Sequence, residues 1–442
     1  MIEIGTVNQS LKTVNSKLKT VFFVECNRMN NRAAEIYDAL IVGGGPAGAC
    51  VAIRLAQGGA RVLLVEQKKF PRAKLCGEFI SPECLEHFAQ LGVIDSMLAA
   101  GGVNLVETIF YTQSGRSFSV PSKWFGAVNG SSTALGLSRA EMDARLLRRA
   151  REAGVEVLEE TQAVGLIIKD KQVCGVSLKT NGGKARAVSS LVTIDATGRA
   201  RLLARLLQKS ESQAMRAPKS RAHLVAFKVH LEAARNGVGQ CEIYSYRGGY
   251  GGLSGVENNL SNLCFIVAAR DVRRCGSDAE RVMREVVCRN KQAAYALKDA
   301  RVASRWLSVA LESFGRGRSA PADGLLAIGD AASFIDPFTG SGMLMALESG
   351  ESAAKTIKRL LPELRQRTNE ALPKLTREYQ ELYDLRFSAR LRVCAVLRGA
   401  AFMPRLNEAM IFALGASERA RRLLARATRS SSLSSVHDIR EI

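Results

Sequence analysis

Three glycines, Gly43, Gly45 and Gly48, have the Gly-x-Gly-x-x-Gly spacing that binds the pyrophosphate of a dinucleotide. They follow a short apolar stretch, and the apolar run that begins with Pro46 and Ala47 predicts a helix directly after the turn. The first glycine allows the tight turn, the second lets the backbone approach the phosphates, and the third lets helix and strand pack closely. The helix N-terminus then faces the phosphates with its partial positive charge. The motif predicts a dinucleotide site and leaves NAD, NADP and FAD open.

A carboxylate follows the glycine turn at the distance where dinucleotide sites bind ribose. Glu66 lies about twenty residues after the turn and ends the apolar run 62–65. Its side chain can accept hydrogen bonds from both ribose hydroxyls. Lys68 and Lys69 follow closely. Because a basic residue here suits the additional phosphate of NADP, that cofactor stays open.

The elements that must position these residues indicate an α/β chain, α+β overall. Residues 36–66 predict a strand, a helix and a second strand, which is the beginning of a parallel sheet. Ser138 precedes an arginine-rich run with helical spacing and is a predicted N-cap. Between 223 and 270, strand-like stretches alternate with glycine- and asparagine-rich turns, which predicts an antiparallel sheet. A helix is predicted over 341–361, ending before Pro362, and the chain after it is helical and basic.

The composition restricts the partners and the compartment. Lysine and arginine number 63 against 42 acidic residues, a net charge of +21 for 442 residues, so contact with an anionic membrane or an acidic carrier protein is an open expectation. No zinc-finger, RRM or KH pattern predicts specific nucleic-acid binding. The ten cysteines lack the paired spacing of metal sites and disulfide frameworks, so no metal is predicted. No long uncharged apolar run and no secretory signal pattern occur, so we expect a cytoplasmic protein, with peripheral contact at the inner membrane surface left open.

Two later segments carry glycine and aspartate in a related pattern. Asp195 and Gly198 lie in Thr-Ile-Asp-Ala-Thr-Gly-Arg, and Gly329 and Asp330 lie in Leu-Leu-Ala-Ile-Gly-Asp-Ala-Ala. Together with the glycine turn, these segments resemble, in the same order, the nucleotide-binding motifs of the flavin monooxygenase and reductase superfamily with the p-hydroxybenzoate hydroxylase-like fold. The resemblance implies FAD as the cofactor. It also implies that Asp330 hydrogen-bonds the ribityl hydroxyls.

The same resemblance implies further contacts with FAD. The stretch Asp-Pro-Phe-Thr-Gly-Ser-Gly contains Pro337, Gly340 and Gly342 ahead of a predicted helix. Backbone N–H groups at this helix start would face the flavin and stabilise negative charge on it. Arg139, in Ser-Arg-Ala-Glu-Met-Asp, is implied to reach the FAD, and Val164 to lie near the adenine.

The resemblance covers about 36–361 and implies two interleaved domains. The implied boundaries are 1–35 for a polar N-terminal extension; 36–105, 136–210 and 310–365 for a Rossmann-like FAD-binding domain with a parallel sheet; 106–135 and 211–309 for an antiparallel-sheet substrate domain; and 366–442 for a basic helical C-terminal segment. Residues 386–414 in that segment mix apolar residues with arginine. They either cover a lipophilic channel, contact a membrane surface or pack as an ordinary helical pair.

The stretch Lys74-Leu-Cys76-Gly77 bears on the chemistry of the flavin. It resembles the Lys-x-Cys-Gly signature of geranylgeranyl reductase-type flavoproteins, which implies that Lys74 contacts the cofactor and that Cys76 lies beside the flavin. A thiol there could protonate the carbon opposite the one that receives hydride, act as a redox partner, or only pack. Gly77-Glu78 followed by Pro82 is partly similar to a halogenase stretch, but the halogenase motif Trp-x-Trp-x-Ile-Pro is absent, which disfavours halogenation.

Tyr250 lies in a glycine-rich loop, Tyr-Gly-Gly-Leu-Ser-Gly, and is a candidate catalytic residue on the substrate side. This loop stands where the reductases have Pro-x-x-Tyr-x-Trp-x-Phe-Pro, which weakens the case for an isoprenoid substrate. We expect an FAD-dependent oxidoreductase that uses NADH or NADPH and acts on an apolar small molecule, isoprenoid or polyketide. Double-bond reduction of the geranylgeranyl reductase type is favoured slightly over monooxygenation through a flavin hydroperoxide. A non-catalytic lipid-binding protein is the alternative from another class.

Overall fold

The computed structural model describes residues 36–125, 132–211, 223–311, 314–402 and 404–429. All of them belong to one unit of the chain, 36–442. The predicted extension 1–35 lies outside the described residues, as do short parts of the other predicted ranges. The predicted domain boundaries therefore stay a prediction.

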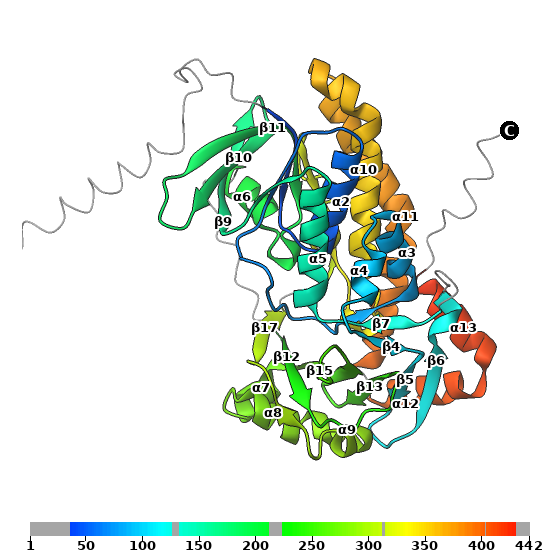
Figure 1. Cartoon of the computed structure of the whole chain (residues 1–442). Coiled ribbons are helices and arrows are strands. Elements are labelled where there is room, and N and C mark those ends of the chain that lie inside the picture. Colours follow the sequence, from blue (N-terminus) through cyan, green and yellow to red (C-terminus); the bar gives the residue numbers. More distant parts are fainter. Residues whose placement is uncertain (1–35, 126–131, 212–222, 312–313, 403, 430–442) are drawn as a thin grey trace, which may run out of the picture. The chain divides into compact units, whose positions relative to one another are not determined.

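The strand, turn and helix around the glycine motif begin a mixed sheet (Figure 1). β1 (Tyr37–Val42) lies between two parallel strands, and α2 (Pro46–Gln57) is the crossover helix that follows the glycine turn. Two antiparallel strands extend the sheet beyond β11. The order is β8 (Glu156–Leu158), β2 (Val62–Val65), β1, β11 (Arg186–Asp195), β10 (Gln172–Thr180) and β9 (Thr161–Lys169), with β19 (Leu325–Ala327) parallel beside β11.

Successive side chains of β1 point to opposite faces of the sheet and pack into two different hydrophobic cores. Ala39 and Ile41 pack on one face with α2. Leu40 and Val42 pack on the other face with α6 (Leu202–Glu211). Because both faces of this strand are covered, it reads as a continuous apolar run, which is typical of the centre of a parallel sheet.

The predicted antiparallel sheet is present, and it includes the parallel pair of β5 and β13. Phe227, Val229 and Leu231 of β12 pack on one face against α7 (Ala269–Arg274), α8 (Ala279–Glu285) and α9 (Lys291–Ala296). The alternate residues of β12 therefore face the opposite side, toward the cavity described below. The order is β16 (Arg301–Val302), β12 (Leu224–Glu232), β15 (Ser261–Ala268), β14 (Gly249–Gly255), β13 (Gln240–Tyr246), β5 (Glu107–Tyr111) and β6 (Ser117–Pro121), with β17 (Leu307–Leu311) beside β12.

Smaller elements connect the two sheets. Ser138 caps α5 as predicted, because its Oγ accepts a hydrogen bond from Glu141 N at 3.2 Å. The elements are a sheet of β3 (Phe79–Ile80), β7 (Ala134–Gly136) and β4 (Val103–Leu105); the pair of β18 (Gly315–Arg316) and β20 (Ser333–Phe334); and the helices α3 (Pro82–Gln90), α4 (Ile94–Leu98) and α5 (Arg139–Glu152).

Tyr250 lies in a strand, so the prediction of a loop there is wrong. β14 pairs along its length with both β13 and β15. Glycine is a poor strand residue, but here the neighbouring strand comes too close for a side chain. A Cβ added to Gly249 would lie 1.9 Å from Ile266 O, and one added to Gly251 would lie 2.8 Å from Phe265 Cβ.

The predicted end of a helix before Pro362 is also wrong. α10 (Gly342–Gln366) continues through the proline and stops at Arg367, which has a φ of 55°. Proline within a helix removes a hydrogen bond and costs about 3 kcal/mol. Leu361 on one side and Leu364 on the other are both buried, so packing of the apolar face offsets this cost.

The C-terminal segment is helical, as predicted, wherever it is described. α11 (Ala371–Ala401) lies along α10, and α12 (Pro404–Ala416) and α13 (Glu418–Ala427) contact β6 of the antiparallel sheet (Figure 1). The predicted fold class, a parallel sheet with a second antiparallel sheet and a helical C-terminal segment, is confirmed. Among the described helices, none combines the length and the hydropathy needed to cross a bilayer.

Candidate active site

A cavity of about 300 Å³ lies between the glycine turn and one face of the antiparallel sheet. Most of the residues predicted to form the site lie in its wall. They are Gly45, Pro46, Ala47, Lys74, Cys76, Arg139, Gly198, Tyr250, Gly329, Asp330, Pro337, Gly340 and Gly342. The predicted residues outside this wall are Gly43, Gly48, Glu66, Val164 and Asp195.

The three glycines of the turn differ in what their missing side chains allow. A Cβ on Gly43 would lie 2.3 Å from Ala196 O, and one on Gly48 would lie 1.9 Å from Gly43 O. Packing of the neighbouring backbone leaves no room for a side chain at either position. A Cβ on Gly45 would meet nothing nearer than Arg139 Nη2 at 3.7 Å, so the open side of Gly45 belongs to the cavity. This is the geometry expected where backbone approaches a phosphate.

Glu66 is held firmly beside the turn. Its Oε2 accepts a hydrogen bond from Gly44 N at 2.9 Å, and its Oε1 accepts one from Lys68 N at 3.0 Å. Arg72 Nη2 lies 3.5 Å from Oε2. The carboxylate is therefore fixed at the end of β2, and its predicted contact with ribose stays a prediction. Val164, on β9, is 36% exposed and its predicted contact with adenine is likewise untested.

Asp195 is buried, and its carboxylate accepts hydrogen bonds from other groups of the protein. It accepts hydrogen bonds from Thr197 N at 3.0 Å, Leu203 N at 3.0 Å and Ala204 N at 3.3 Å. Burial raises the pKa of the Asp195 carboxyl, and these donors act in the opposite direction. The side chain thus fixes the turn that brings Gly198 to the cavity wall, and it does not itself line the cavity.

Groups of both charges face the cavity near the glycine turn. Lys74, Arg199 and Asp330 all line it, and in the described part of the chain neither Lys74 Nζ nor the Asp330 carboxylate makes a hydrogen bond to protein. Arg199 stacks over Phe334, with its guanidinium 5.2 Å from the ring centroid. Burial raises the pKa of Asp330, and Lys74 and Arg199 act against this. Arg199 was not predicted as a site residue, although it directly follows Gly198 in the second motif.

The turn from Asp336 to Gly342 carries the start of α10 to the cavity. Asp336 Oδ1 accepts a hydrogen bond from Phe338 N at 2.9 Å and also one from the Tyr250 hydroxyl. The Tyr250 ring packs edge-on against Phe338, at 5.1 Å between centroids. Burial and the neighbouring Asp336 raise the pKa of Tyr250 well above its usual range. The Tyr250 hydroxyl therefore holds the turn against the antiparallel sheet, and its predicted catalytic role stays a prediction.

The rest of the cavity wall is mostly apolar, and the C-terminal segment forms part of it, including the side chains of Arg421 and Arg429. One face of the antiparallel sheet, which includes Gly252, supplies the first part of this wall. The helices supply the other part, which supports the predicted cover over a channel among the three alternatives. The apolar lining includes Phe79, Phe110, Phe118, Val120, Phe125, Ile243, Leu397, Met410, Ile411, Leu414 and Leu424.

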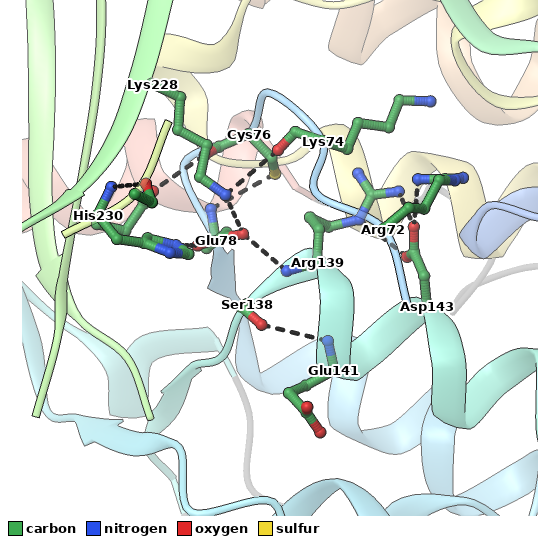
Figure 2. Close-up of polar contacts among 12 residues, drawn as sticks. Arg72, Lys74, Cys76, Glu78, Ser138, Arg139, Glu141, Asp143, Lys228 and His230 are labelled. Atoms are coloured by element: carbon green, nitrogen blue, oxygen red, sulfur yellow. Dashed lines mark hydrogen bonds and ion pairs between the residues drawn. The ribbon is translucent and has the colours of Figure 1, made fainter. Parts of the chain in front are cut away.

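A buried acidic residue, Glu78, stands next to Cys76 and was not predicted as a site residue. Figure 2 shows it between the Cys76 loop, α5 and β12. Glu78 N donates to Cys76 Sγ at 3.4 Å, and Arg139 N donates to Glu78 Oε1 at 2.7 Å. Lys228 forms an ion pair with Oε1, and His230 Nε2 lies 2.6 Å from Oε2. A lysine in the middle of the apolar stretch Leu-Val-Ala-Phe-Lys-Val-His-Leu was the signal in the sequence, because a buried lysine needs a counter-ion.

Comparison with known proteins identifies the family. The FAD binding domain family matches residues 36–372. The chain belongs to this family. It is 26% identical to a digeranylgeranylglycerophospholipid reductase of Methanocella arvoryzae, over 73% of this chain and 77% of that protein. It is 27% identical to the flavin-dependent halogenase armH3 of Armillaria mellea, over 72% of this chain and 67% of that protein.

A solved structure has the same fold as this chain. A geranylgeranyl bacteriochlorophyll reductase-like protein from Thermoplasma acidophilum superposes with a TM-score of 0.72 at 19% identity. The match covers 92% of this chain and 99% of that one. The predicted resemblance to FAD-dependent reductases and halogenases is confirmed, and the chain is an FAD-dependent oxidoreductase.

The residues of the cavity fit FAD. The open side of Gly45 admits a pyrophosphate, and Lys74 and Arg199 supply cations that suit phosphates or a negatively charged flavin. Asp330 supplies an acceptor for hydroxyl groups. The N-terminus of α10, which begins at Gly342, brings backbone N–H groups to the same space.

We expect FAD affinity to fall as pH rises through about 8. Burial, together with the cations of Arg139 and Arg72, lowers the pKa of Lys74 to about 8, and Asp143 and Asp330 act in the opposite direction. Below that pH the ammonium attracts the anionic cofactor, and above it the attraction is lost. Fluorescence titration of apoprotein with FAD at pH 7 and pH 9 should show a several-fold weaker affinity at pH 9, about 3- to 10-fold. Lys74→Met should bind FAD with the weaker affinity at both values, and a pH effect that persists in this variant would assign it to another group.

Proposed function

We propose that the protein reduces a carbon–carbon double bond in an apolar, isoprenoid-type chain, with NADH or NADPH as the source of electrons. The observation that carries the proposal is the position of Cys76 in the cavity wall. The charged groups that fit FAD and the apolar wall of the antiparallel sheet line the same cavity as the thiol. The reductase relative of Methanocella arvoryzae, named for a digeranylgeranyl lipid, supports the same class of substrate.

Each part of the cavity has a role in this reaction. The chemistry that FAD supplies is transfer of a hydride to one carbon of the double bond. The apolar lining binds the chain and keeps water away from the reacting carbons. Cys76 donates a proton to the second carbon, which completes the addition of two hydrogens. Arg139, joined to Asp143 through Nε at 2.9 Å and Nη2 at 2.8 Å, holds its guanidinium rigidly beside this thiol and the glycine turn.

We expect Cys76→Ala to retain FAD and to lose most of its turnover. Loss of a general acid slows a reaction by about 100-fold or more. The measurement is anaerobic incubation of holoenzyme with NADPH or NADH and geranylgeraniol, followed by mass spectrometry of the product. Cys174→Ala is the matched control, because Cys174 lies on β10, outside the cavity wall.

The same assay decides between the proposed reaction and its alternatives. Two added hydrogens in the product support reduction. An added oxygen under aerobic conditions would identify a monooxygenase and contradict the proposal. Full turnover by Cys76→Ala would leave the reductase assignment in place but would show that the thiol only packs.

A further inference from the structure

Glu78, Lys228 and His230 form a buried cluster at the edge of the cavity, called here the Glu78 cluster (Figure 2). The Glu78 side chain is fully buried, and that of Lys228 is 3% exposed. The His230 side chain is 16% exposed, so it reaches from the carboxylate toward solvent. Glu78 also has a φ of 54°, a left-handed conformation that a glutamate adopts only when its surroundings hold it there.

The antiparallel sheet places this cluster in register with the cavity. Ala226, Lys228 and His230 share one face of β12, and Ala226 lines the cavity. Asn262 of β15 lies opposite His230, and its Nδ2 donates to Cys76 O at 3.2 Å. The strands that carry the cavity wall therefore also hold the backbone of the Cys76 loop.

Lys228 joins the carboxylate and this loop. Its Nζ donates to Glu78 Oε1 and to Lys74 O at 3.3 Å. Figure 2 shows the Lys74 side chain extending away from Lys228, so the two ammonium groups have separate positions. His230 and Lys228 lower the pKa of the Glu78 carboxyl against the effect of burial, so the resting group is a carboxylate. His230 is the partly exposed member of the cluster, so it is the one that can exchange a proton with water.

The proposed reduction creates a need for such a group. Once Cys76 has given its proton to carbon, a C–H bond has formed, the S–H bond has broken and a thiolate remains. The thiolate must then regain a proton from solvent. Cys76 is partly buried and charged side chains line the wall around it, so a route through these side chains adds to direct protonation by water. Glu78 lines the same cavity as Cys76, donates its backbone N–H to the Cys76 thiol at 3.4 Å, and contacts the partly exposed His230 through its carboxylate.

We propose that His230 and Glu78 deliver a proton from solvent to Cys76, with Lys228 holding the Glu78 carboxylate in place. A protonated His230 passes the Nε2 proton to Glu78 Oε2, the carboxylic acid passes a proton to the thiolate, and His230 regains a proton from water. Each turnover then consumes one hydride and one solvent proton. This inference rests on the proposed function, because it assumes that Cys76 loses a proton in each cycle.

Other charged and titratable groups also lie near Cys76 and Lys228. Arg139 on α5 and Arg199 lie near the thiol, and Cys264 of β15 lies directly opposite Lys228. The two arginines stay charged over the range in which enzymes work. Burial raises the pKa of Cys264 to about 12, so this thiol keeps its proton. Of these groups, His230 is the one that connects the Glu78 carboxylate with solvent.

The first test is rescue of His230→Ala by imidazole. We expect the reoxidation of prereduced holoenzyme by geranylgeraniol to slow by about 100-fold, and millimolar imidazole to restore a large part of the rate. His223→Ala, at an exposed position outside the cavity wall, is the matched control and should neither slow nor respond to imidazole. A slow His230→Ala that imidazole does not rescue, although it retains FAD, would overturn the proton route.

A second test needs no substrate and no turnover. Alkylation of Cys76 by iodoacetamide, followed by peptide mass spectrometry across pH in the FAD-loaded protein, reports the charge of the thiol. Glu78→Gln removes a negative neighbour and should shift the profile to lower pH by about one unit, and Lys228→Met should shift it to higher pH. Shifts in opposite directions for the two variants support the inference. Shifts of both profiles in the same direction would result from loosening of the loop and would overturn it. The absence of any shift would also overturn it. If wild-type protein fails to reduce geranylgeraniol, the proposed function fails, and this second test still decides the coupling of Glu78 to Cys76.

Discussion

Gly45→Val is expected to abolish FAD binding and to leave the fold intact. The Cβ of the new side chain meets nothing closer than Arg139 Nη2 at 3.7 Å, so the protein itself can accommodate it. Its two methyl groups then occupy the space through which the backbone approaches the pyrophosphate. Affinity for FAD should fall by at least about 100-fold, because close backbone contact with the phosphates is lost. The purified variant should be colourless and should fail to take up added FAD, while its far-ultraviolet circular dichroism matches wild type.

Two other glycines serve as controls for this variant. Gly165→Val, on β9, has its nearest neighbour at 3.6 Å and lies outside the cavity wall, so it should bind FAD normally. Gly48→Ala should misfold, because its Cβ would lie 1.9 Å from Gly43 O. A yellow Gly45→Val protein with full FAD content would contradict the placement of the cofactor at this turn.

Glu78→Gln is expected to cause a large loss of stability. The ammonium of Lys228 would stay in a position where its side chain is 3% exposed, without the carboxylate that now compensates its charge. Breaking one partner of a buried ion pair costs about 3–5 kcal/mol. Urea unfolding of the apoprotein, followed by circular dichroism, should show the lower midpoint.

A double variant separates lost charge balance from lost packing. In Glu78→Gln/Lys228→Met both members of the buried Glu78–Lys228 ion pair are removed, so a large part of the stability should return. Glu285→Gln is the control for a surface pair, because Glu285 and Arg281 are both well exposed and water screens their interaction. A double variant as unstable as Glu78→Gln would show that the cost comes from the shape of the site and not from the charge of Lys228.

Local patterns were sufficient to predict the structure of the glycine turn and its flanking elements. The glycine spacing around Gly45, the apolar run of β1 and the cap at Ser138 each depend on residues close together in the chain, and the structure confirms the strand, the helix and the cap. The antiparallel sheet was also predictable, because its strands alternate in a local period of two. The strand at Tyr250 was missed because its glycines are explained only by the closeness of the neighbouring strand. The continuation of α10 through Pro362 was missed because packing outweighs the intrinsic cost of proline.

The sequence by itself indicated an FAD-binding chain, through a glycine turn that predicts a dinucleotide site and two later segments that resemble motifs of an FAD-dependent superfamily. Only the tertiary structure decided which side chains meet around Cys76. Glu78 and Lys228 are 150 residues apart and are joined by an ion pair, and the helices that form part of the cavity wall come from the far end of the chain. Such contacts depend on the register between β12 and β15 and on the packing of α11 to α13, which no local pattern encodes. A buried lysine in the sequence indicates that a counter-ion is needed, but only the tertiary structure shows that Glu78 is that counter-ion.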